Sequence, residues 1–232
     1  MHTILITGAN RGIGLELARQ ALLSGHRVYA ACREPAGATD LHRLAASHDD
    51  ALRIIPLDVT DAAQIADAVA TIDRECGHLD GLINNAGILN QGEDLDSVSA
   101  AAMEDTFRVN SIAPLLLSRA CLPLLSRSDL PVILNVSSQM GSLTRKTSGG
   151  SYSYCASKAA LNMVSRALAA DLRPHGVVVM TAHPGWVQTD MGGPAATLTP
   201  AESADGLLNL LEAATMEKSG GFYVWDGSVH PW

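Results

Sequence analysis

The stretch TILITGANRGIG, residues 3–14, carries the strongest indication of the fold. It opens with β-branched and aliphatic residues, which are typical of a buried strand. It ends in a turn that holds Gly8, Gly12 and Gly14. The residues that follow repeat Leu and Ala at helical spacing until Gly25, where the pattern stops. A strand, a glycine-rich turn and a helix in this order predict the first unit of a parallel α/β sheet.

Short apolar runs alternate with helical patterns along the rest of the chain. Strands are expected at 27–32, 52–59, 79–85, 131–138, 176–182 and 221–227, with helices around 100–122 and 152–172 between them. Asp61 with Gln64, and Thr199 with Glu202, form capping pairs that predict two further helix starts. Strands without polar alternation, separated by helices, indicate a sheet covered on both faces. We therefore predict an α/β protein with one doubly wound Rossmann-type domain over 1–232 and a seven-stranded, mostly parallel sheet.

The composition excludes several classes of partner. The chain has 232 residues, a formal net charge of −8 and no basic run, which argues against binding nucleic acid or an anionic membrane. The longest apolar stretch, 112–125, contains Arg119 and two prolines and is too short to span a bilayer. No signal-peptide pattern follows Met1, and the four cysteines form no CxxC pair. We expect a cytoplasmic protein with free thiols and no metal site.

The glycine turn predicts a nucleotide site. Glycines at the N-terminus of a helix let backbone N–H groups approach a pyrophosphate closely, although they could also serve only a tight bend. The end of the second strand then bears on the choice of cofactor. Cys32 and Arg33 occupy the place where an acidic residue would bind the ribose diol of NAD. Arg33, joined by Arg11, favours the 2′-phosphate of NADP, whereas Glu34 turned inward would favour NAD.

The segment SYSYCASK, residues 151–158, predicts the acid–base pair. Tyr154 and Lys158 are four residues apart and share a helix face, whereas Tyr152 points elsewhere. A free tyrosine has a pKa near 10, and a cation within about 4–6 Å lowers a neighbouring pKa by about 1–3 units. We therefore expect Lys158, helped by an oxidised nicotinamide, to lower the pKa of Tyr154.

These motifs together resemble the short-chain dehydrogenase/reductase family. The resemblance rests on TGANRGIG, NNAG at 84–87, Asn110, the NVSS strand end at 135–138 and Tyr154-x-x-x-Lys158, in this order. It covers essentially the whole chain. The segments HPGWVQTDMGG (183–193) and GGFYVWDGSVHPW (220–232) further resemble the branch that contains sniffer-like carbonyl reductases and bacterial C-factor proteins.

The resemblance implies roles for individual residues. Tyr154 would be the general acid and base, Lys158 would bind the nicotinamide ribose, Ser138 would orient the carbonyl, and Asn110 would hold a water relay. The first half of the chain, about 1–130, would bind the cofactor, and the second, about 131–232, would bind substrate. The residues expected at the cofactor are Gly8, Asn10, Arg11, Gly12, Ile13, Gly14, Arg33, Asp58, Val59, Asn85, Ala86, Gly87, Tyr154, Lys158, Pro184, Gly185, Val187 and Thr189.

Some assignments remain open. Ser142 competes with Ser138, because the loop between the strand end and Tyr154 is slightly enlarged. Asn85, Asn110 and Asp58 could instead make purely structural hydrogen bonds. A substrate pocket is expected near four apolar residues that could equally be core: Met140, Leu143, Trp186 and Met191.

The expected activity is hydride transfer between NADP(H), favoured over NAD(H), and a carbonyl or alcohol substrate. The small segment MGGPAATLTP, 191–200, would serve as a short lid over an open, apolar pocket. A homodimer or homotetramer is expected through the helices that carry Asn110 and Tyr154. The alternative function is a C-factor-like nucleotide-binding regulator in which catalysis is secondary.

Overall fold

The computed structural model describes the backbone of residues 1–232 and all side chains except that of Asp49. Its strands are β1 (Thr3–Thr7), β2 (Arg27–Cys32), β3 (Leu52–Pro56), β4 (Gly81–Asn84), β5 (Val132–Val136), β6 (Val178–His183) and β7 (Phe222–Val224). Its α-helices are α1 (Gly12–Leu23), α2 (Thr39–Ala46), α3 (Ala62–Glu75), α4 (Ala100–Phe107), α5 (Ala113–Leu125), α6 (Tyr152–Leu172) and α7 (Pro200–Glu212). Helix and strand thus alternate as the hydrophobic pattern predicts.

The seven strands form one sheet in the order β3-β2-β1-β4-β5-β6-β7. Every pairing between these strands is parallel, so the sheet is fully rather than mostly parallel. The order reverses between β1 and β4, which is the point where open α/β sheets bind ligands. The doubly wound α/β prediction is therefore confirmed.

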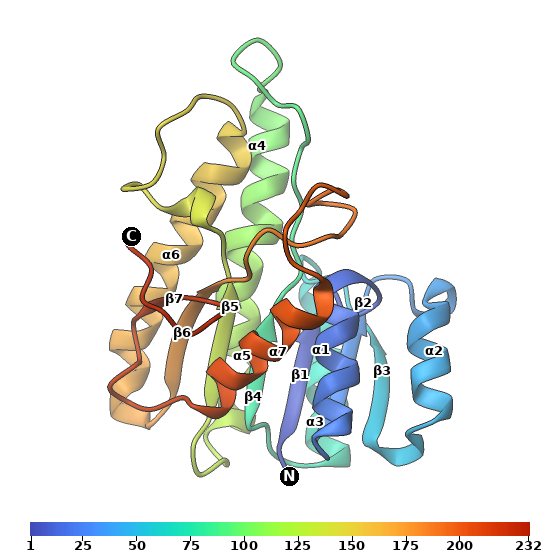
Figure 1. Ribbon diagram of the computed structural model, residues 1–232. Helices are drawn as coiled ribbons and strands as arrows, with labels where there is room; N and C mark the ends of the chain where they lie inside the picture. The colour runs from blue at the N-terminus through green and yellow to red at the C-terminus, as the bar shows by residue number, and fades with distance from the viewer.

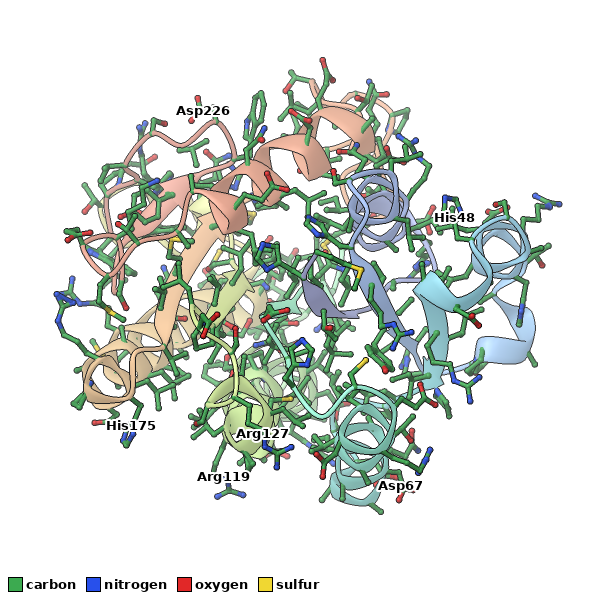
Figure 2. The ribbon with its side chains drawn as sticks, turned by 90° about the horizontal axis from the view of Figure 1, so that it is seen from below. His48, Asp67, Arg119, Arg127, His175 and Asp226 are labelled. Atoms are coloured by element: carbon green, nitrogen blue, oxygen red, sulfur yellow. The ribbon has the colours of Figure 1, made fainter. Side chains whose placement is uncertain are left out.

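Two apolar layers cover the sheet, because successive side chains of a strand point to opposite faces. Ile4 and Ile6 of β1 pack with α1, α2 and α7, while Leu5 belongs to the layer that contains α3, α5 and α6. Figure 1 shows α1 and α7 in front of the strands. In Figure 2, seen from below, the labelled Asp67 and Arg119 point outward from the opposite layer.

Two helix starts confirm the capping pairs read from the sequence. Asp61 accepts hydrogen bonds from the backbone N–H groups of Ala63 and Gln64 at the start of α3. Thr199 and Glu202 form a reciprocal capping box at α7. Such bonds satisfy amides that have no partner inside the helix, and they fix where each helix begins.

The helix expected around 100–122 contains an irregular turn. After α4 the backbone passes through a π-helical turn, η3 (Arg108–Ile112), before α5 begins. Asn110 lies in this turn and is fully buried. Single π-turns inside helices are rare and are frequent at functional sites. The turn aims Asn110 toward the loop that follows β4, as its hydrogen bonds below show.

The carboxyl ends of the strands lie together at one edge of the sheet, at the top of Figure 1. The loop before α4 and the loop before α6 both rise on this side. In the part of the chain that the structure describes, no helix is long and apolar enough to cross a membrane. The same described side chains include no group of three or more His, Cys, Asp or Glu that could hold a metal ion.

Candidate active site

A cleft of about 690 Å³ opens at the carboxyl ends of the strands, a size typical of ligand pockets. It crosses the switch point between β1 and β4. Its lining includes most of the residues expected at the cofactor: Gly8, Asn10, Arg11, Gly12, Ile13, Gly14, Arg33, Asp58, Val59, Asn85, Ala86, Gly87, Tyr154, Lys158, Pro184 and Thr189. The structure therefore brings together motifs that are far apart in the sequence.

The glycine turn fits a phosphate group closely. Gly8 and Gly12 have φ of +64° and +54°, and a Cβ on Gly14 would lie 2.2 Å from the Gly8 carbonyl oxygen. Arg11 precedes α1, and no side chain among the described residues caps the helix. The first amides of α1 therefore face the cleft without a side-chain acceptor, which is the arrangement that binds anions at helix N-termini.

Asn85 joins the two walls of the cleft, which are the glycine turn after β1 and the segment that follows β4. Its side-chain Nδ2 donates to the carbonyl oxygens of Thr7 and Gly8, at 2.9 and 3.3 Å. The backbone N–H groups of Asn85 and Ala86 both donate to Thr7 Oγ1, at 3.0 Å each. The structural role considered for Asn85 is thus present, and it holds the glycine turn against the segment that follows β4.

The far end of the cleft is basic. Arg33 and Arg108 line it, and both lower the pKa of Asp58, although the largest cause is the hydrogen bond from the Thr60 backbone N–H. Glu34 is exposed and does not belong to the cleft lining. Arg11, predicted as a second phosphate ligand, lines the cleft and forms an exposed ion pair with Asp190, at 2.7 Å.

Tyr154 and Lys158 are both buried and lie at the inner end of the cleft. Lys158 Nζ is 5.8 Å from the centroid of the Tyr154 ring and donates to the Val136 carbonyl oxygen at 2.8 Å. The helical spacing of the two residues therefore places both side chains in one cleft, as the sequence predicts. Tyr152 is partly exposed and does not line the cleft.

Burial shifts the protonation of both groups. It raises the pKa of Tyr154 to about 12, an effect that a hydrogen bond from Ser138 opposes only in part. Burial also lowers the pKa of Lys158 to about 8. The expected decrease in the Tyr154 pKa is therefore wrong for the protein alone, because desolvation of the phenolate outweighs the hydrogen bond from Ser138. At neutral pH, Tyr154 is protonated and Lys158 is mostly charged.

The serines after β5 have separate environments. Ser137 lines the cleft, and its Oγ donates to Asn162 Oδ1 at 2.6 Å. Ser138 forms a hydrogen bond with the Tyr154 phenol that lowers the pKa of the phenol. Its Oγ also accepts from the Met140 backbone N–H at 3.1 Å. Ser142 donates to the Pro231 carbonyl oxygen at 2.8 Å. Of the three, Ser138 is therefore the one that contacts the candidate acid.

Both polar atoms of the Asn110 side-chain amide form hydrogen bonds within the protein. Its Oδ1 accepts from the Ile88 N–H at 2.9 Å, and its Nδ2 donates to the Ile88 carbonyl oxygen and to Ser157 Oγ, at 2.9 and 3.0 Å. A Cβ on Gly87 would lie 3.3 Å from Asn110 Oδ1 and 3.6 Å from Lys158 Nζ. Asn110 thus fixes the loop after β4 beside Lys158, while its role in a water relay stays a prediction.

Four of the residues predicted for catalysis or cofactor binding lie outside the cleft lining: Asn110, Ser138, Gly185 and Val187. Val187 is buried, and Gly185 contacts Leu198 and Trp225. Of the apolar residues expected at the substrate, only Met191 lines the cleft, while Leu143 and Trp186 are exposed and Met140 is half-buried.

The sequence did not point to several other residues that line the cleft: Leu57, Thr60, Ile88, Asp105, Arg108, Val109, Gln188 and Asp190. All of them except Asp105 lie within three residues of a predicted site residue, so proximity in sequence was the available signal.

The fold and the cleft define a nucleotide-binding α/β protein of the Rossmann type. Comparison with known proteins makes this assignment specific. Residues 2–198 match the family model described as short chain dehydrogenase. The chain belongs to this family and is an oxidoreductase of the dehydrogenase/reductase type.

Three relatives illustrate the similarity. The C-signal protein of Myxococcus xanthus is 46% identical over 156 residues, which are 67% of this chain and 94% of that protein. The NADPH-bound carbonyl reductase from chicken fatty liver has a TM-score of 0.95 and 39% identity, over 100% of this chain and 99% of that one. The carbonyl reductase Sniffer of D. melanogaster has a TM-score of 0.95 and 34% identity, over 100% of both chains.

Proposed function

We propose that the protein reduces carbonyl compounds with NADPH and that Tyr154 is the proton donor. The observation that carries this proposal is the buried pair Tyr154 and Lys158, which lies in the same cleft as the open N-terminus of α1. The NADPH-bound carbonyl reductase that this chain resembles over its full length supports the same choice of substrate and cofactor.

The residues of the cleft fit NADPH. The first amides of α1 would bind the pyrophosphate, and Arg33 and Arg108 would attract the additional phosphate. Lys158 would hold the nicotinamide ribose, and the bound cofactor would supply a hydride. The position of Glu34 outside the lining supports NADPH over NADH, because the acidic residue that follows β2 does not line the cleft where it would bind the ribose diol.

The chain's own part in the reaction is the movement of one proton. Because its pKa is about 12, Tyr154 carries its proton at neutral pH and can donate it from the phenolic oxygen to a carbonyl oxygen. The single hydroxyl proton of Ser138, which donates to that phenol in the free protein, would turn to the carbonyl oxygen of the substrate and orient it. Charged Lys158 would stabilise the phenolate that remains. A protonated acid at the working pH is the form that reduction of a carbonyl compound requires.

The substrate would enter beside Met191, under the segment 191–200. This segment is held near the cleft by bonds from Gln91 Nε2 to the carbonyl oxygens of Asp190 and Met191, at 3.0 and 3.4 Å. Trp186 Nε1 donates to the Gly192 carbonyl oxygen at 2.8 Å and folds the segment on itself. A short lid of this kind supports an open pocket for small apolar carbonyl compounds.

The direct test follows oxidation of NADPH and of NADH with a panel of aldehydes, ketones and quinones. Tyr154→Phe is expected to lower kcat by about 10²- to 10⁴-fold, the usual contribution of a general acid, while NADPH still binds. Tyr152→Phe, in the same turn of α6 but outside the cleft lining, is the matched control and should retain wild-type kcat. Absence of turnover with both cofactors in the wild-type protein would contradict the proposal.

A nucleotide-binding signalling role is the second candidate, and the 46% identity to C-signal favours it. If that role is the principal one, Tyr154→Phe will retain biological activity in a signalling assay although its reductase activity is lost. Loss of both activities in this variant would support the enzyme.

A further inference from the structure

Helix α6, which carries Tyr154 and Lys158, begins in an unusual way. Ser151, just before its first turn, has φ +50° and is the only described residue other than glycine with a positive φ. Its side chain does not cap the helix. The first amides of any helix need acceptors from outside it. The acceptor at this helix therefore bears on the placement of the candidate acid.

Glu93, from the loop between β4 and α4, supplies this acceptor. Its Oε2 accepts from the Ser153 backbone N–H at 2.7 Å, and its Oε1 accepts from the Ser153 hydroxyl. Its backbone carbonyl oxygen accepts from the Ser151 N–H at 2.8 Å. Three bonds thus join one residue of a distant loop to the first turn of α6.

These hydrogen bonds are the main interactions that offset the cost of burying the Glu93 carboxylate. The residue is 8% exposed and Ser153 is 0% exposed. Within the part of the chain that the structure describes, no Arg, Lys or His forms an ion pair with Glu93. A buried carboxylate is costly unless it is hydrogen-bonded, and the positive end of a helix also stabilises it.

We infer that Glu93 is a positioning residue for Tyr154, an inference that rests on the proposed reductase function. Ser153 immediately precedes Tyr154, so a carboxylate that fixes Ser153 also fixes where the phenol enters the cleft. The same loop touches the lid two residues earlier, through the bonds from Gln91 to Asp190 and Met191. Loop 85–99 therefore links the substrate side of the cleft to the helix that carries the acid.

The first measurement compares kinetic constants. Glu93→Ala should lower kcat by about 10- to 100-fold, because small misplacements of a reacting group cost up to this much. The KM for NADPH should stay within about twofold, since the phosphate contacts lie at α1 and Lys158 is held by its own bond to the Val136 carbonyl oxygen. Glu93→Gln should restore most of kcat, because its amide oxygen still accepts from the Ser153 N–H. Asp96→Ala removes an exposed carboxylate from the same loop and is the matched control.

The second measurement needs no turnover. Hydrogen exchange of the first-turn amides of α6 should quicken by about tenfold in Glu93→Ala and stay unchanged in Asp96→Ala. If the wild-type protein reduces no carbonyl compound, the proposed function fails, and exchange alone still decides whether Glu93 holds this turn. Exchange and kcat that match those of Asp96→Ala would overturn the inference. Equal losses in kcat, NADPH binding and thermal stability, without rescue by glutamine, would also overturn it by assigning Glu93 a general structural role.

Discussion

Desolvation dominates the chemistry of the two titratable residues at the inner end of the cleft. The pKa of Tyr154 rises to about 12 and that of Lys158 falls to about 8, both chiefly through burial. Each shift favours the neutral form of its group. The phenol is therefore kept as a proton donor, whereas the charge on the amine is sensitive to pH in the range in which enzymes are assayed.

The lowered pKa of Lys158 predicts a pH dependence. Its ammonium is present below about pH 8 and is lost as the pH rises through that value. Because kcat/KM reports groups of the free enzyme, its value for NADPH should fall by about tenfold per pH unit above pH 8. Lys158→Arg keeps its charge over this range, so its profile should be flat even if the rate is lower. A wild-type profile that stays flat to pH 10 would contradict this assignment.

Arg33 should determine the choice of cofactor. Its guanidinium lines the basic end of the cleft, where an additional phosphate would pair with it. Arg33→Ala should raise the KM for NADPH by about 10- to 100-fold, the usual range for a charge-assisted hydrogen bond, and leave the KM for NADH nearly unchanged. Arg43→Ala, which removes an exposed arginine of α2, serves as the control. Equal changes in the KM values for NADPH and NADH would contradict this role for Arg33.

Sequence reasoning identified site residues wherever local spacing carries the information. Tyr154 and Lys158 meet in one cleft because a helix brings residues four apart to one face. Glu93 carries no such signal, since it acts across a contact between segments distant in the chain. The direction of the Tyr154 pKa shift could not be predicted from the sequence either, because desolvation depends on the complete packing around the phenol.

At the scale of elements, the turn between β1 and α1 tolerates no added methyl group. A Cβ on Gly14 would lie 2.2 Å from the Gly8 carbonyl oxygen and 2.6 Å from Asn85 Nδ2. Both atoms belong to the bonds that hold the two walls of the cleft together. The backbone itself must therefore move to accept any larger residue.

Gly14→Ala should consequently lower the free energy of unfolding by about 1–3 kcal/mol, as overpacking typically does, and weaken NADPH binding. Gly37→Ala is the control, since nothing lies within 4 Å of the added atom. Thermal unfolding and a binding titration measure the two effects. An unchanged Gly14→Ala protein would show that the turn can relax.

The helices and strands were predictable from the sequence where the hydrophobic pattern extends over many residues. Strands and helices formed where apolar runs and capping pairs placed them, and α6 has the bounds expected for it. The π-turn at Asn110 was missed, because a single additional residue in a helical turn leaves the hydrophobic period almost unaltered. Strand β3 ends earlier than expected, since Leu57, Asp58 and Val59 leave the sheet to line the cleft. Strands β4, β5 and β7 are also shorter than the runs predicted for them.

For the whole molecule, we expect a homodimer or homotetramer formed through α5 and α6. These helices expose apolar side chains, with Met163 68% and Leu116 37% exposed, and Ile112 at the end of η3 is 47% exposed. Met163→Glu should shift the mass in solution toward the monomer, because burying an unpaired charge disfavours the interface. Leu23→Glu, at an exposed apolar position of α1, should leave the mass unchanged. A wild-type protein that is monomeric by light scattering would contradict this expectation.

The strand order also has a consequence for how the chain acquires its shape. β1 pairs with β2 on one side and with β4 on the other, so the centre of the sheet closes only after residues 81–83 reach the first strand. Parallel pairing between segments so distant in the chain is slow to form. The two walls of the cleft come from these two strands and meet only at that late step. Nucleotide present during refolding would therefore bind the completed sheet and would not bind species formed earlier. Its binding would then measure the last stage of folding.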